Sequence, residues 1–112
     1  MISIADLEKR YKMDPVDVRI GGIASDLARL SSMANTVHPN LSAIKNVLTE
    51  IKFFSEWAAM DADLKIQERI LSLQRVVTRW KEETIQDHLE EIHKIGIEWS
   101  DVMLEMSGLT NK

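Results

Sequence analysis

His38, which stands directly before Pro39, is the residue of this sequence most suited to chemistry. An exposed imidazole can accept a phosphoryl group or bind a metal ion, because it changes protonation near neutral pH. Phosphoryl transfer also needs a carboxylate beside the ring to orient it or take its proton, and here the next residue is a proline. We therefore interpret His38 as the last residue of a helix that Pro39 stops, where a protonated ring interacts favourably with the helix dipole. Phosphoryl transfer at His38 is the alternative.

The segment ANTVHPNLSAIKNVL, residues 34–48, resembles the phosphoacceptor helix of sensor kinases. In that family a run of small residues leads to the histidine and then to a proline ahead of a similar Leu-Ser-Ala-Ile-Lys stretch. The resemblance implies a helical domain in which His38 accepts phosphate. The chain departs from the family where Pro39 replaces the acidic residue after the histidine, and 112 residues leave no room for an ATP-binding domain.

Glu90 and His93 form a Glu-x-x-His pair, the motif with which di-iron helical bundles hold metal. Such centres need the pair twice, and the sequence contains it once. We expect His93 to flank the apolar face of its helix and His88 to point elsewhere, so that both are solvated. No nucleophile elbow or phosphate-binding glycine loop is present. We therefore predict that the protein is not an enzyme. We also predict no catalytic residue, metal site, cofactor or small-molecule substrate.

The composition of the chain limits the cellular compartments and the binding partners that we expect for it. The chain has a net charge of −4 and no cysteine. The missing cysteines exclude disulfides and thiolate metal sites, and the negative charge gives no general attraction to nucleic acid. No apolar run approaches the roughly 20 residues that span a bilayer, and no signal-peptide pattern is present. We expect a cytoplasmic protein with no membrane contact.

Apolar residues recurring at alternating steps of four and three predict four long amphipathic helices. We place these helices at residues 15–37, 40–59, 62–81 and 84–107. The short connections between them favour antiparallel neighbours. The predicted fold class is therefore all-α, an antiparallel up-down-up-down four-helix bundle preceded by a short N-terminal helix or arm. The arm, the bundle and a tail are assigned to residues 1–13, 14–109 and 110–112.

Signals at the helix ends support these boundaries. Asp14 followed by Pro15 suits the start of the first bundle helix. Thr84, with an acidic residue three positions on, resembles a capping box for the fourth helix. Gly108 is expected to end that helix in a left-handed conformation, with Leu109 folding back on it.

The antiparallel register predicts which side chains share the core. The four expected layers are Ala34, Ile44, Val77 and Leu89; Leu30, Leu48, Leu73 and Ile92; Leu27, Ile51, Ile70 and Gly96; and Ile23, Phe54, Ile66 and Trp99. A glycine inside a helix costs about 1 kcal/mol relative to alanine. We expect Gly96 to make room for the Trp99 indole or for close approach of another helix. The Gly21-Gly22 pair is a point where the first helix could kink.

Charge is divided unevenly between the last two predicted helices. Residues 64–81 carry five basic side chains against one acidic, whereas residues 82–107 carry eight acidic side chains against one lysine. Four of the basic residues fall within an arc of about 120° on a helical wheel: Lys65, Arg69, Arg75 and Arg79. We expect this basic strip to pair with acids of the neighbouring helix or of a second subunit. Contact with nucleic-acid phosphates is the alternative.

Aromatic residues indicate a surface at one end of the bundle. Phe53 and Trp57 lie one turn apart, and the register brings Trp99 to the same end. One or both of Phe53 and Trp57 should lie on a flank, where they cover the N-terminal arm or form an exposed apolar patch. Such patches bind partners, although core packing explains these residues too. We predict a non-enzymatic protein-interaction module, an adaptor or regulatory subunit that forms a homodimer.

Overall fold

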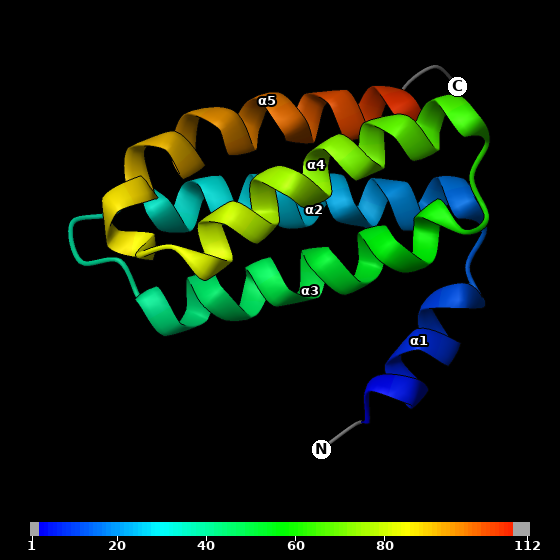
Figure 1. Ribbon diagram of the computed structural model, residues 1–112, viewed down its shortest axis with the longest axis horizontal. Coiled ribbons are helices and arrows are strands. Elements are labelled where there is room, and N and C mark those ends of the chain that lie inside the picture. The colour runs from blue at the N-terminus through cyan, green and yellow to red at the C-terminus, as the bar shows by residue number, and fades with distance from the viewer. Residues whose placement is uncertain (1–2, 109–112) are drawn as a thin grey trace.

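The computed structural model describes residues 3–108, and every regular element in that range is a helix (Figure 1). The elements are α1 (Ile4–Lys12), α2 (Val16–Ala34), α3 (Leu41–Ala59), α4 (Leu64–Glu82), the short 3-10 helix η1 (Ile85–His88) and α5 (Leu89–Ser107). Successive long helices run in opposite directions (Figure 1). The prediction of an all-helical protein is confirmed. No helix within residues 3–108 is long and apolar enough to cross a membrane.

Three helices begin at a side chain that caps the first turn. Ser3, Asn40 and Asp63 each accept a hydrogen bond from the backbone N–H three residues on, at 3.2, 3.0 and 3.0 Å. Such caps satisfy one of the N–H groups that a helix start leaves without a partner. α2 instead follows Pro15, whose fixed φ suits the entry into a helix.

The first bundle helix ends earlier than predicted. α2 stops at Ala34, where the Asn35 N–H donates to the carbonyl of Ser32 at 3.1 Å and leaves the helical path. The interpretation of His38 as the last residue of a helix is therefore wrong, because His38 lies in the connecting loop. The glycine pair does not break the helix, since α2 is continuous through it.

The fourth predicted helix begins later than expected. The Thr84 side chain makes no capping bond. Its carbonyl instead accepts from the Asp87 N–H at 3.0 Å, which closes a tighter 3-10 turn. The predicted capping box is therefore wrong, and the α-helix starts at Leu89. At the other end Gly108 adopts the expected left-handed conformation with φ 75°, whereas Leu109 and the tail lie outside the described residues.

α2 and α5 form the closest helix pair. A Cβ added to Gly96 would lie 3.3 Å from Cβ of Ser31 and 3.4 Å from the Leu27 carbonyl oxygen. The Ser31 hydroxyl donates to the His93 carbonyl, and the Ser100 hydroxyl donates to the Ala24 carbonyl at 2.7 Å. Gly96 is therefore explained by close approach of another helix, one of its two predicted roles.

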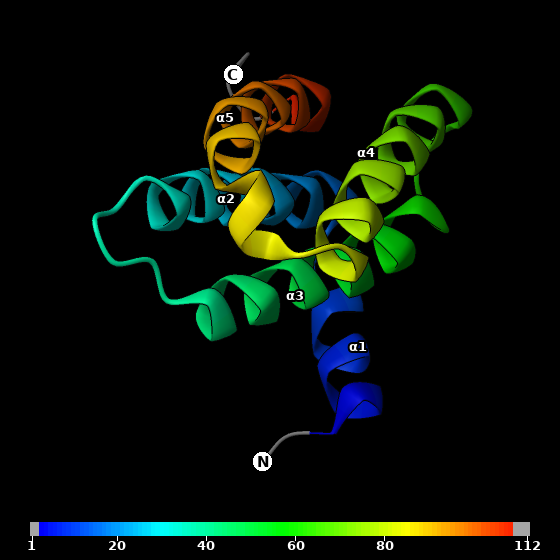
Figure 2. The ribbon, with the colours of Figure 1, turned by 60° about the vertical axis from the view of Figure 1, so that its left-hand side comes forward.

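α4 and α5 barely contact each other along their length. α4 packs on α3 and α5 packs on α2, and α4 and α5 lie apart from each other in Figure 2. α3 also contacts α2, so it lies between α2 and α4 in the order of contacts.

The core is continuous across α2, α3, α4 and α5. Most of the predicted core positions are buried, including Ile23, Leu48 and Leu73 at 0% exposure. Four predicted members are only partly buried: Leu89, Phe54, Ile66 and Trp99. The buried apolar residues outside the predicted layers are Ile20, Ala24, Val47, Trp57, Ala58, Trp80 and Met103.

α1 extends from one end of the packed long helices as an arm (Figure 1). It packs on α3 and, less extensively, on α2, and none of its residues is buried. A helix of nine residues is marginal in isolation, so α1 depends on these contacts.

Candidate functional site

The predicted partner surface of Phe53, Trp57 and Trp99 is divided between two places. Tyr11 of α1 stacks on Phe54, with ring centroids 4.3 Å apart and planes 4° apart, and its centroid lies 5.9 Å from that of Trp57. Phe53 stacks on Trp57 at 5.5 Å, and Trp57 is only 6% exposed. Trp99 lies half-buried on α5 and forms no ring pair within residues 3–108. This end of α3 therefore covers the N-terminal arm, one of the two placements that the sequence predicts.

A buried arginine fixes the junction between α1 and α2. Arg19 is 6% exposed, and its Nη1 donates to Oδ2 of Asp61, in the α3–α4 connection, at 2.9 Å. Its guanidinium also lies 5.7 Å from the Tyr11 ring centroid, and the Tyr11 hydroxyl donates to the Arg19 carbonyl at 2.9 Å. This group was not predicted from the sequence, in which the spacing of Leu7 and Tyr11 on one face of α1 is the available signal.

Replacing Tyr11 by alanine should release α1 from α3. The variant loses the stacking on Phe54 and the hydroxyl bond, and a helix this short cannot stay ordered alone. We expect trypsin to cleave after Lys9 and Arg10 at least about tenfold faster than in wild type, because cleavage follows local opening. Tyr11→Phe, which keeps the ring, is the matched control and should stay within about threefold. Equal protection in all three proteins would contradict this role of Tyr11.

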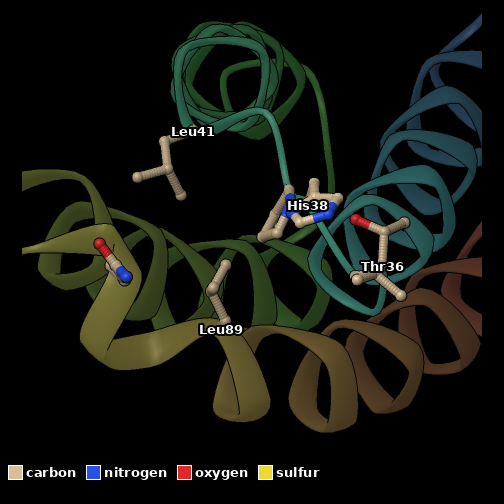
Figure 3. A pocket seen from close by; sticks show the side chains of 7 residues that line it. Thr36, His38, Leu41 and Leu89 are labelled. Carbon is tan, nitrogen blue, oxygen red and sulfur yellow. The ribbon is translucent and has the colours of Figure 1, made fainter.

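His38 is exposed beside a shallow pocket at the α2–α3 loop. The pocket has a volume of about 440 Å³ and is lined by Thr36, Val37, His38, Pro39, Leu41, Gln86 and Leu89 (Figure 3). Its lining contains no carboxylate, and the His38 ring makes no hydrogen bond or ion pair with residues 3–108. No described group is therefore placed to orient the ring for phosphoryl transfer.

The other two histidines are structural contacts. The Nδ1–H of His93 donates to the Ser31 carbonyl at 3.1 Å, so this half-buried ring joins α5 to α2. The expectation that His93 is solvated is wrong. His88 lies 2.6 Å from a carboxylate oxygen of Glu83, and Glu90 pairs with Lys94 at 2.9 Å. Among residues 3–108 no three potential metal ligands cluster together.

Asp26 and Glu50 share a single arginine between α2 and α3. The Arg29 guanidinium lies 3.5 Å from Asp26 and 3.2 Å from Glu50. The Asp26 side chain is 16% exposed, and its Oδ2 is buried without a hydrogen-bond donor. Burial, reinforced by the Glu50 charge and opposed by Arg29, raises the pKa of Asp26 to about 7. This carboxyl pair was not predicted from the sequence, because its members belong to different helices.

The carboxyl pair lies at the edge of a groove beneath α1. Ile4 and Leu7 of α1 form one wall, and Val47 and Phe53 of α3 form another. Polar side chains complete the lining: Arg29, Asn46, Thr49 and Glu50. The groove has a volume of about 400 Å³. Because Glu50 is part of this lining, its position affects the surface on which α1 rests.

All four residues of the predicted basic strip are exposed on α4. Arg79 pairs with Glu91 of α5, and Glu91 also accepts a hydrogen bond from the Trp80 indole at 3.1 Å. Lys65, Arg69 and Arg75 have no carboxylate within ion-pair distance in the described range. The predicted pairing with the neighbouring helix is thus present at one residue of four.

α5 presents acids along one edge, of which Glu91 contacts α4. Glu91, Glu98 and Glu105 recur every seven residues, so they follow one line on the helix. Glu98 and Glu105 are exposed and form no ion pair with residues 3–108. Beside this line lie four half-buried apolar residues: Ile95, Trp99, Val102 and Met106. We call the basic edge of α4, the acidic edge of α5 and these four residues the α4–α5 seam.

No protein family, curated protein or solved structure matches the chain. The carboxyl pair and the α4–α5 seam are therefore interpreted from their own geometry.

Proposed function

We propose that the protein is a non-enzymatic protein-interaction module, an adaptor or regulatory subunit, that associates with a second copy of itself through the α4–α5 seam. This proposal rests on one observation: the charged side chains of the seam are paired near η1 and, within the described residues, unpaired further along. The Arg79–Glu91 pair forms where the helices meet, near η1. Further along, Lys65 and Arg69 on α4, and Glu98 and Glu105 on α5, have no partner within the described chain.

A second copy fits the seam because the seam is complementary to itself. In a two-fold arrangement the basic edge of α4 faces the acidic edge of the partner's α5, and the reverse contact forms by symmetry. The half-buried residues beside the acidic edge supply apolar area, and Trp99 suits the centre of such an interface. The partner would then lie against both α4 and α5.

Nucleic acid suits the seam less well. Phosphates would approach Lys65 and Arg69 but would also meet Glu98 and Glu105, whose charge repels them. A partner with both charges satisfies both edges. The distribution of charge therefore favours protein over nucleic acid.

Charge reversal at the two edges tests the proposal. In one variant Glu98→Lys and Glu105→Lys place basic against basic residues, and in the other Lys65→Glu and Arg69→Glu place acid against acid. We expect each variant to self-associate at least about tenfold more weakly than wild type in sedimentation equilibrium, because like charges meet in both contacts. An equimolar mixture of the two should form a heterodimer, since opposite charges then face each other in both contacts.

The heterodimer separates this proposal from closure of the seam within one chain. Closure within a chain would change the stability of each variant, and mixing the two would produce no complex. Glu56→Lys, on an exposed position of α3, is the matched control and should leave self-association unchanged. A wild-type protein that stays monomeric up to its solubility limit would refute the proposal.

A further inference from the structure

The carboxyl pair and the groove beneath α1 together suggest a response to pH. Two carboxyls face one guanidinium across the α2–α3 contact, with Arg29 lying 3.5 Å from Asp26 and 3.2 Å from Glu50. One cation cannot balance two adjacent carboxylates, and the Asp26 Oδ2 is buried with no donor. A proton held between the carboxyls removes one negative charge and supplies a donor, since a protonated carboxyl can donate a hydrogen bond.

We propose that Asp26, Glu50 and Arg29 form a proton-operated switch that controls how firmly α1 is docked. With the proton in place, Asp26 donates to Glu50, and both side chains stay between α2 and α3. When the proton leaves, the two carboxylates repel each other and one of them must move.

Glu50 is the group expected to move. Its side chain is 36% exposed, against 16% for Asp26, so it reaches water at lower cost. Its outward path enters the groove that Ile4 and Leu7 of α1 help to line. A charge placed beside these apolar side chains weakens the contact that holds the N-terminal half of α1.

The groups acting on Asp26 come from each adjoining helix. Arg29 of α2 favours its ionised form, and Glu50 of α3 disfavours it. Tyr11 of α1 interacts with the Asp26 charge. Burial and this charge both hold the pKa of Tyr11 above its ordinary range. Burial and the charge of Glu50 together raise the pKa of Asp26 to about 7, so the switch operates near neutral pH.

Trypsin cleavage within α1 measures the switch. Cleavage after Lys9 and Arg10 is followed at pH 6, 7 and 8, and each rate is divided by that of a free peptide of the same sequence. We expect the normalised rate in wild type to rise about fivefold or more from pH 6 to pH 8, as local opening becomes easier. Asp26→Asn keeps a donor beside Glu50 and cannot ionise, so its rate should change less than twofold.

Two comparisons keep the test decisive. Glu56→Gln removes an exposed carboxylate from the same helix as Glu50 and should behave like wild type. Carbon-13 spectra of the Asp26 carboxyl should show a titration between pH 6 and 8. The inference is overturned if Asp26→Asn shows the same rise as wild type, or if the Asp26 carboxyl is fully ionised at pH 5. Both results are independent of self-association through the α4–α5 seam.

Discussion

Replacing Gly96 by valine is expected to lower the free energy of unfolding by about 3 kcal/mol, the upper part of the range for overpacked cores. The first added carbon would already lie 3.3 Å from Cβ of Ser31 and 3.4 Å from the Leu27 carbonyl oxygen. The two further methyl groups of valine have no space unless α5 moves away from α2. Such a movement would also stretch the hydrogen bonds that Ser31 and Ser100 make between these helices. Urea unfolding followed by circular dichroism measures the change.

Gly22 provides the matched control for this substitution. It lies within α2, and a Cβ added there meets nothing within 4 Å. Gly22→Ala should therefore raise the free energy of unfolding by about 0.5–1 kcal/mol through helix propensity alone. If Gly96→Val and Gly22→Ala gave similar stabilities, the close approach of α2 and α5 would not be a major source of stability.

Replacing Asp26 by asparagine is expected to raise the free energy of unfolding at pH 8 by about 2–4 kcal/mol and to remove a pH dependence. The pKa of Asp26 rises from its ordinary value of 3.8 to about 7 on folding. The folded chain therefore holds this proton more tightly than the unfolded chain. The resulting stability is fully present below pH 3.8 and is lost as the pH rises toward 7. Asparagine keeps the neutral, hydrogen-bonding form at every pH.

The measurement is a series of urea unfolding curves between pH 4 and pH 8.5. Other groups titrate in the same range, so the informative quantity is the difference between wild type and Asp26→Asn at each pH. This difference should grow from about zero at pH 4 to its full value at pH 8. A difference that does not vary with pH would mean that Asp26 is ionised throughout. Glu56→Gln should show no such trend.

The long helices and most of the core follow from the sequence because apolar periodicity is a local property. Ile23, Leu48 and Leu73 sit on predicted stripes and are fully buried. Helix ends were less predictable, since they depend on which backbone hydrogen bond forms first. At Thr84 the carbonyl accepts from three residues on and starts a 3-10 turn. The residue types at positions 84–87 are compatible with both an α-helical turn and a 3-10 turn.

Most of the candidate sites could not be predicted from the sequence. Arg19 and Asp61 are 42 residues apart, and no local pattern indicates that they meet. The carboxyl pair likewise joins side chains of two helices. The close approach of α5 to α2 at Gly96 is likewise not reported by a heptad pattern. The sequence shows the uneven charge of the two helices. It does not show that most of these charged side chains lack an ion-pair partner within residues 3–108.

The close contact between α2 and α5 has a consequence for how the chain is made. Ser31 is hydrogen-bonded to His93, and Ala24 to Ser100. These partners are 62 and 76 residues apart in the sequence. At a synthesis rate of about 5–20 residues per second, α2 waits roughly 3–15 s for the segment that completes its contact. Its apolar face must meanwhile rest on α3, the nearest helix to leave the ribosome. Nascent chains stalled before residue 89 should therefore be sensitive to protease and recruit chaperones, whereas released full-length chains should not.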